Sequence, residues 1–143
     1  MIVQTLSGKV EGMKLDGAYG FRGIPYASPA TGRRRFKPPA PPLPWQGVRR
    51  CDRFGDIAPQ PPAQQGILSE LTQSEDCLNL NVWTPEDLSD GPKPVMVYIH
   101  GGGFVAGTGA ECDGARYASE EGIVYVSINY RLGALGFLYL GVC

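Results

Sequence analysis

The sequence predicts an α/β fold in which a small antiparallel sheet precedes the first strands of a larger, mostly parallel central sheet. Two apolar runs, residues 94–100 and 123–129, lack polar alternation, which is typical of strands buried on both faces. A helical segment separates them, and the order strand, loop, helix, strand favours a parallel pair. Short β-prone segments broken by glycines occupy residues 2–22.

The N-terminal residues are expected to form three short strands, at residues 2–5, 8–15 and 18–22. Asp16-Gly17, between the last two, is a strong hairpin-turn signal because glycine readily takes positive φ. These segments predict the small antiparallel sheet.

Residues 23–75 are expected to be mainly irregular, because prolines interrupt them throughout. They lie at Pro25, Pro29, Pro38, Pro39, Pro41, Pro42, Pro44, Pro59, Pro61 and Pro62. Proline breaks helices and is excluded from central strands. A loop this long is uncommon in a compact domain, so we expect it to wrap the surface of something larger.

Regular structure is predicted again from residue 78 onward. Residues 78–83 alternate apolar and polar side chains, as in a half-buried strand, and the polar residues 85–93 indicate a turn. A short helix is expected over residues 115–121, with Gly122 as its C-terminal stop.

The composition excludes several classes of function. Hydrophobic residues make up 43% of the 143 residues and charged residues 19%, as in globular proteins. The net charge of −1 argues against a nucleic-acid partner or an anionic membrane. No segment approaches the roughly 18 apolar residues of a membrane span, and the N-terminus does not resemble a signal peptide. We therefore expect a cytoplasmic protein without a membrane or nucleic-acid partner.

Metal binding is not expected from the cysteine and histidine content. The 4 cysteines are scattered without a C-x-x-C pair, and His100 is the single histidine. A zinc site needs about four clustered ligands.

The segment with the clearest chemical meaning is His100-Gly101-Gly102-Gly103-Phe104, directly after a predicted strand. Consecutive glycines let backbone N–H groups face a cavity without obstruction by side chains. Two such N–H groups can stabilise the oxyanion of a tetrahedral intermediate, and this pattern is that of the esterase oxyanion hole.

Two other interpretations of this loop are open. It could be only a tight turn. It also matches the dinucleotide fingerprint G-x-G-x-x-G/A at Gly101, Gly103 and Ala106. The nucleotide interpretation is weak, because Gly107 and Gly109 keep the loop irregular where a helix should begin. No acidic residue ends the following strand either.

Four ordered segments together resemble a known family. They are residues 21–27 (FRGIPYA), 74–85 (SEDCLNLNVWTP), 100–104 (HGGGF) and 129–138 (NYRLGALGFL). The chain is similar to the N-terminal part of type-B carboxylesterases, the family that includes cholinesterases. The resemblance implies the α/β-hydrolase fold, with residues 1–143 forming an incomplete domain, and a serine-type hydrolase of small carboxylic esters that needs no cofactor.

The resemblance also implies roles for individual residues. Gly102 and Gly103 would be oxyanion donors. Independently of the resemblance, Phe104 borders this loop and is a candidate to line the substrate pocket, against the alternative of a core position. Arg35 would pair with Glu75 and anchor the proline-rich loop, against the alternative of an exposed pair worth under about 1 kcal/mol. Arg131 would be structural, its ion-pair partner lying downstream and its charge buried and unpaired in this chain.

The catalytic triad is not expected in these residues. The nucleophile of this fold sits in G-x-S-x-G, and no serine of the chain has glycine two residues before and after it. The nucleophile, acid and base would therefore lie outside residues 1–143, and His100 would have a structural hydrogen-bonding role. We expect the isolated chain to be inactive, to fold poorly and to need the C-terminal portion of the domain. The alternative is a non-catalytic truncated product or a binding module on the same scaffold.

Two smaller features complete the predictions. Relatives that bridge the cysteine of the E-D-C segment use a C-P-Q segment upstream, and Ala58 stands in its place here, so Cys77 is expected to be a free, buried thiol. Arg35-x-x-Pro38-x-x-Pro41 matches a polyproline ligand of SH3-type domains, but a rigid surface loop is the favoured interpretation, because such matches are common in any proline-rich loop.

Overall fold

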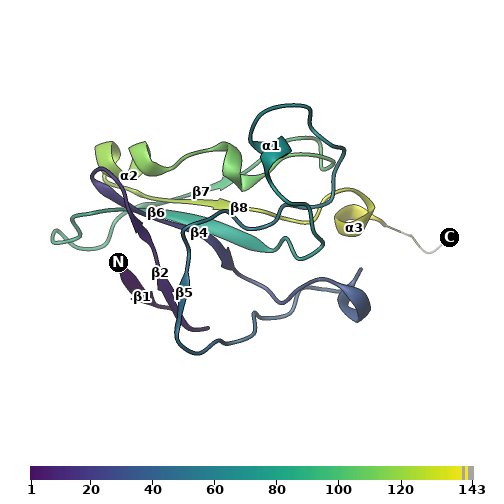
Figure 1. The fold of residues 1–143 in the computed structure, drawn as a ribbon, viewed down its shortest axis with the longest axis horizontal. Coiled ribbons are helices and arrows are strands. Elements are labelled where there is room, and N and C mark those ends of the chain that lie inside the picture. The colour runs from purple at the N-terminus through teal and green to yellow at the C-terminus, as the bar shows by residue number, and fades with distance from the viewer. Residues whose placement is uncertain (140, 142–143) are drawn as a thin grey trace.

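The computed structural model describes residues 1–139 and 141 of the chain, which form two sheets with short helices around them (Figure 1). The strands are β1 (Ile2–Gln4), β2 (Lys9–Glu11), β3 (Met13–Lys14), β4 (Ala18–Pro25), β5 (Val48–Arg50), β6 (Asn79–Pro85), β7 (Val95–Ile99) and β8 (Val124–Ile128). The helices are α1 (Ile67–Glu70), α2 (Ala115–Glu121) and α3 (Gly133–Phe137), with 3-10 turns η1 (Gly32–Arg34) and η2 (Gly109–Glu111).

The larger sheet has the order β3-β4-β6-β8-β7. Strands β7 and β8 are parallel and in register from Val95↔Val124 to Ile99↔Ile128, which confirms the predicted parallel pair and the α/β class. The other neighbours are antiparallel, so this part of the sheet is mixed. A parallel pair needs a crossover, and the segment carrying α2 supplies it.

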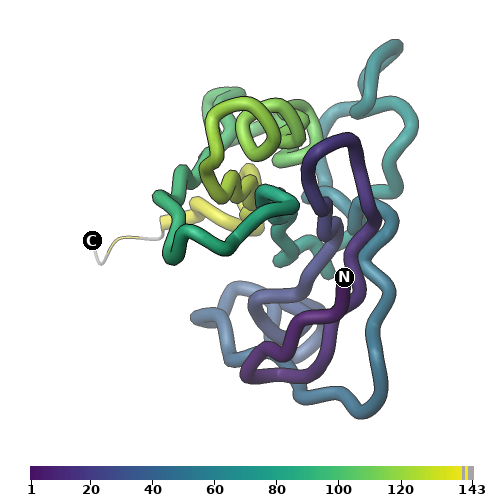
Figure 2. Tube along the Cα trace, turned by 90° about the vertical axis from the view of Figure 1, so that its left-hand side faces the viewer, coloured from purple at the N-terminus to yellow at the C-terminus, as the bar shows by residue number. Residues whose placement is uncertain are grey.

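The N-terminal strands differ from the prediction in two ways. The strand expected over residues 8–15 breaks at Gly12, so that β2 and β3 belong to different sheets. A Cβ at Gly12 would lie 2.7 Å from the ring of Phe21, which explains why a glycine stands at this break. The small sheet is also mixed, because β5, from the segment expected to be irregular, adds to β2 in parallel (Figure 2).

Strand β6 is covered on both faces. The face that carries its asparagines is the more buried of the two. Asn81 is 1% exposed, whereas Val82 is half-buried. Asn81 accepts a hydrogen bond from the N–H of Gly23 (3.0 Å) and donates one to Ser127 Oγ (3.0 Å). These bonds explain how a polar side chain tolerates burial.

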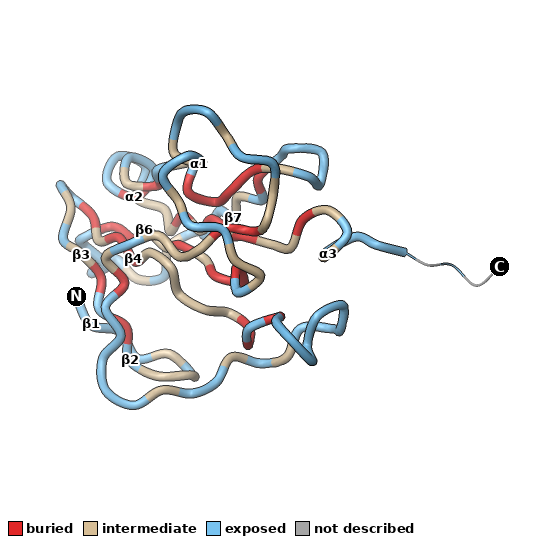
Figure 3. The backbone as a smooth tube through the Cα atoms, turned by 45° about the vertical axis from the view of Figure 1, so that its right-hand side comes forward, coloured by how far each residue is buried: buried red, intermediate tan, exposed pale blue. Residues whose placement is uncertain are grey.

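Strand β7 contradicts the expectation that residues 94–100 are buried on both faces. Val95, Met96, Val97 and Ile99 are 47–65% exposed. β7 is the last strand of the sheet, so one of its edges has no neighbouring strand among the described residues. Buried segments run through the middle of the sheet and through parts of the loops near α1, while the described C-terminal residues are exposed (Figure 3).

Helix α2 has the predicted bounds and covers the sheet. It ends where Gly122 adopts φ +66° and donates to the carbonyl of Tyr117, a left-handed cap that favours glycine. Its Ala118 packs with Trp83 and Tyr125 in one of the core clusters. Within the described part of the chain, no helix has the length and apolar character that crossing a membrane requires.

Candidate functional site

The glycine loop, residues 100–107, leaves the carboxyl end of β7 in a conformation that demands glycine. Gly102 and Gly103 have φ of +106° and +61°. A Cβ on Gly102 would lie 1.9 Å from the carbonyl oxygen of Ala106, closer than any side chain permits. The carbonyl of Gly102 accepts from the N–H groups of Val105 and Ala106, both at 3.1 Å, which closes the turn.

The N–H groups of Gly102 and Gly103 remain available to a ligand. Neither donates a hydrogen bond to any residue that the structure describes, and both residues are exposed. Two neighbouring free donors at the end of a strand form a potential anion site. Backbone N–H groups without an internal partner are the kind of donor that an oxyanion hole uses.

Phe104 continues the loop with strained backbone geometry. Its φ of +65° is unusual for a bulky residue and costs on the order of 1–3 kcal/mol. The N–H of Gly133 donates to its carbonyl at 2.7 Å, and its ring lies against Phe137 with centroids 4.6 Å apart. These contacts hold the ring at the edge of an open cavity.

The cavity has a volume of about 500 Å³ and is mainly apolar and aromatic. Its wall includes Ile99, His100, Gly103, Phe104, Ile128, Tyr130 and Phe137. Of the two residues with free N–H groups, Gly103 lines this cavity and Gly102 precedes it in the chain. An apolar cavity of this kind can hold the hydrocarbon part of a small molecule.

His100 lies behind the loop, in a buried position. It is 3% exposed, and its ring stacks on Tyr130 with centroids 4.2 Å apart. Its Nδ1 lies 2.8 Å from the carbonyl oxygen of Gly101. These contacts support the structural role expected for it.

Arg35 and Glu75 meet across 40 positions of the sequence. The Nε of Arg35 donates to Glu75 Oε2 at 2.6 Å, and the second nitrogen, Nη2, contacts Oε1. The hydrogen bond from Arg35 lowers the pKa of Glu75, although the pair is open to solvent. The bidentate geometry joins the start of the proline-rich loop to the segment before β6.

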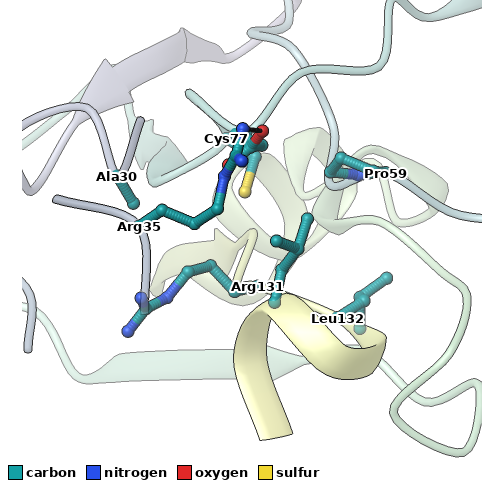
Figure 4. A pocket seen from close by; sticks show the side chains of 8 residues that line it. Ala30, Arg35, Pro59, Cys77, Arg131 and Leu132 are labelled. Atoms are coloured by element: carbon teal, nitrogen blue, oxygen red, sulfur yellow. Dashed lines mark hydrogen bonds and ion pairs between the residues drawn. The ribbon is translucent and has the colours of Figure 1, made fainter. Parts of the chain in front are cut away.

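Cys77 is a free, fully buried thiol, which confirms the prediction. Burial raises its pKa to about 11. Its sulfur points into a cluster formed by Ala30, Arg35, Pro59, Arg131 and Leu132 (Figure 4). Because the lining leaves no room for water, the cluster is packing rather than a binding site.

Arg131 corrects the expectation of a buried, unpaired charge. It is half-buried, and its Nη1 donates to the carbonyl oxygen of Lys37 at 3.0 Å. No ion pair of Arg131 occurs among the described residues. Its guanidinium instead holds the proline-rich loop through a backbone carbonyl.

Two amide side chains that the sequence analysis did not single out hold the end of the glycine loop. Gln60 hydrogen-bonds the backbone of Gly107. Asn129 Oδ1 accepts from Thr108 Oγ1 (2.9 Å) and from the N–H of Gly109 (2.8 Å). Gln60 lies in the segment Ala58-Pro59-Gln60, which matches the C-P-Q segment of the relatives. That match is the feature of the sequence that could have singled out Gln60. Among residues 1–139 and 141, no cluster of three His, Cys, Asp or Glu side chains could hold a metal ion.

Comparison with known proteins identifies the family of this chain. The model of the carboxylesterase family matches residues 1–142. The chain belongs to this family. This confirms the resemblance to type-B carboxylesterases drawn from the four segments.

Curated relatives agree with this assignment. The carboxylesterase chain is 46% identical over 143 residues to the para-nitrobenzyl esterase of Bacillus subtilis, covering 97% of this chain and 29% of the relative. It is 44% identical over 144 residues to phenmedipham hydrolase of Pseudarthrobacter oxydans, covering 96% of this chain and 29% of that protein.

Solved structures show the same fold. A thermophilic pNB esterase superimposes with a TM-score of 0.91 at 43% identity, covering 97% of this chain and 29% of that one. The crystal structure of carboxylesterase Est55 of Geobacillus stearothermophilus gives a TM-score of 0.87 at 40% identity, covering 98% and 28%. The chain thus has the architecture of an N-terminal part of an α/β-hydrolase and spans less than a third of the length of these relatives.

Proposed function

We propose that this chain supplies the oxyanion hole of a serine-type hydrolase that acts on small carboxylic esters. The main observation behind the proposal is that the neighbouring N–H groups of Gly102 and Gly103 are free, and that Gly103 and Phe104 line an apolar cavity. The names of the relatives, para-nitrobenzyl esterase and phenmedipham hydrolase, support hydrolytic chemistry.

The proposed mechanism is acyl transfer. A serine hydroxyl attacks the ester carbonyl carbon while a histidine takes its proton, and the carbonyl oxygen becomes negative. The N–H groups of Gly102 and Gly103 donate to that oxygen. The C–O bond to the alcohol then breaks, the histidine returns the proton to the alcohol, and water hydrolyses the acyl-serine. The serine, acid and histidine are supplied from outside residues 1–143.

A fusion protein tests this proposal. It joins residues 1–143 to the part of the Bacillus subtilis para-nitrobenzyl esterase that follows its matched N-terminal segment. We expect the fusion protein to hydrolyse para-nitrobenzyl esters. Gly102→Ala should lower kcat by about 10²–10³-fold, because the Cβ must displace the donor loop.

Gly91→Ala is the matched control. Gly91 has φ +99°, close to that of Gly102, but a Cβ there would meet nothing within 4 Å. It should keep kcat within about two-fold, since only backbone strain is added. A folded fusion protein that is inactive, or one in which Gly102→Ala leaves kcat unchanged, would contradict the proposal.

A second candidate function is a non-catalytic binding module on the same scaffold. Residues 1–143 contain no G-x-S-x-G serine, so by themselves they offer donors and a cavity without a nucleophile. It is distinguished from the first by whether the fusion protein turns over esters with dependence on Gly102.

A further inference from the structure

The side-chain amide of Gln60 pairs with the backbone of Gly107 as one strand pairs with another. Its Oε1 accepts from the N–H of Gly107 at 2.8 Å, and its Nε2 donates to the carbonyl of Gly107 at 3.1 Å. The Nε2 also donates to the carbonyl of Ala58 at 3.0 Å. Only one orientation of the amide satisfies these partners, because a carbonyl cannot donate and an N–H cannot accept.

Gln60 projects from a rigid base, although it lies in the proline-rich segment. Its own N–H donates to Gln73 Oε1 at 2.9 Å. Three residues earlier, Ile57 is fully buried and exchanges backbone hydrogen bonds with Thr72 and Ser74, both at 2.9 Å. The amide is therefore a fixed point and not a mobile surface group.

Gly107 connects the Gln60 amide to the start of the glycine loop. It has φ +116°, and a Cβ there would lie 2.3 Å from Nδ1 of His100 and 2.6 Å from the carbonyl oxygen of Gly101. Its neighbour Ala106 donates to the carbonyl of Gly102. A shift of Gly107 would thus be passed to Gly102 through Ala106.

We infer that Gln60 is a positioning residue for ester hydrolysis, which sets the location of the Gly102 donor by clamping Gly107. The inference rests on the proposed function of the glycine loop. It follows from the geometry of oxyanion stabilisation, because donors lose their effect when displaced by a fraction of an ångström from the developing charge. The proline-rich loop thereby acts on the reaction without touching the substrate.

The test uses Gln60→Met in the fusion protein, with Gln64→Met as the matched control. Methionine keeps the length of the side chain and removes its three hydrogen bonds, two to Gly107 and one to Ala58. Gln64 is an exposed glutamine of the same loop with no side-chain hydrogen bond to a described residue. Gln60→Met should lower kcat about ten-fold and leave KM within about two-fold, since transition-state stabilisation is lost and substrate binding is not.

Gln60→Glu adds a readout that a purely structural role would not move. Its carboxyl group can restore both hydrogen bonds to Gly107 only when protonated, because one oxygen then donates and the other accepts. The carbonyls of Ala58 and Gly107 disfavour its charged form. Its kcat relative to the unmodified fusion protein should therefore rise as the pH falls from about 8 to about 5, while the ratio for Gln60→Met stays flat.

The outcomes separate this inference from the proposed function. If Gly102→Ala abolishes turnover and Gln60→Met does not lower kcat, the positioning role is wrong and the oxyanion hole stands. If Gln60→Met lowers kcat only in proportion to a loss of folded protein, measured by thermal unfolding, the role is structural and the inference also fails. If Gly102→Ala has no effect, the proposed function fails first.

Discussion

The hydroxyl of Tyr130 donates to the carbonyl oxygen of His100 at 2.5 Å while the two rings stack 4.2 Å apart. Tyr130 follows β8 and His100 follows β7, so this contact joins the carboxyl ends of the two parallel strands. The carbonyl that it holds belongs to the residue immediately before the glycine loop. The loop is therefore anchored at its start by Tyr130 and at its end by Gln60 and Asn129.

Tyr130→Phe should keep the stacking and remove the hydrogen bond. We expect the free energy of unfolding of the fusion protein to fall by about 1 kcal/mol, the usual net worth of one hydrogen bond. Denaturant titration measures it. Tyr117→Phe is the control, since Tyr117 also stacks on an aromatic ring but its hydroxyl has no hydrogen bond to a described residue. Equal effects of the two substitutions would contradict the prediction.

Cys77 should make the fold sensitive to alkali. Burial raises its folded-state pKa from an ordinary value of 9.0 to about 11. Its contribution to stability is therefore fully present below pH 9 and is lost as the pH rises through 11. In that interval the free energy of unfolding falls with pH, because the unfolded chain releases the Cys77 proton and the folded chain keeps it. Cys77→Ala should make this fall shallower by the amount that corresponds to about one proton.

Denaturant titrations at several pH values between 9 and 11 check this expectation in the fusion protein. Cys112→Ala is the control, because that thiol is only half-buried. An unchanged slope in Cys77→Ala would show that the buried thiol does not govern alkaline unfolding.

The Arg35–Glu75 pair should protect the loop around η1 from proteolysis. Glu75→Gln keeps the shape and removes the charge, so the loop should open more often and trypsin should cut after Arg33 and Arg34 several-fold faster. Mass spectrometry of timed digests gives the rates. Glu120→Gln breaks the comparable bidentate pair with Arg116 on α2, at 2.9 and 3.0 Å, and should leave these rates unchanged. Indistinguishable digestion of the two variants would remove the anchoring role.

The isolated 143-residue chain should self-associate through β7. Its four exposed apolar side chains and unpaired edge favour edge-to-edge contact. Light scattering should show mass rising with concentration, and Val97→Lys should reduce this rise. Val48→Lys changes an exposed valine of the small sheet and should not. A monodisperse monomer with strong near-UV dichroism would refute the expectation.

The isolated chain should also show no catalytic burst with p-nitrophenyl acetate above that of a Gly102→Pro variant. The physical reason is that donors alone stabilise an oxyanion only after a nucleophile has attacked. Stopped-flow absorbance measures the burst. A stoichiometric burst that a fluorophosphonate abolishes would mean that a nucleophile exists within residues 1–143.

Much of the fold follows from local sequence patterns. The parallel pair and helix α2 were predictable because apolar runs, helical periodicity and a terminal glycine are each read over a few neighbouring residues. The presence of the glycine loop was predictable for the same reason, since three consecutive glycines after an apolar run are a local pattern. Gly12 shows the limit: the pattern favoured one strand over residues 8–15, and only the ring of Phe21 explains why a glycine stands at the break.

The sequence by itself determined the family, the order of the main strands and the glycine loop at the end of β7. Only the tertiary structure decided which side chains hold that loop. Gln60 reaches Gly107 across 47 positions, and Tyr130 reaches His100 across 30. The exposure of β7 was decided in the same way, since it depends on which strands lie beside it and not on its own apolar residues. Contacts between distant segments leave no periodic trace in the sequence, because a single glutamine or tyrosine acquires its role from whatever backbone the fold brings beside it.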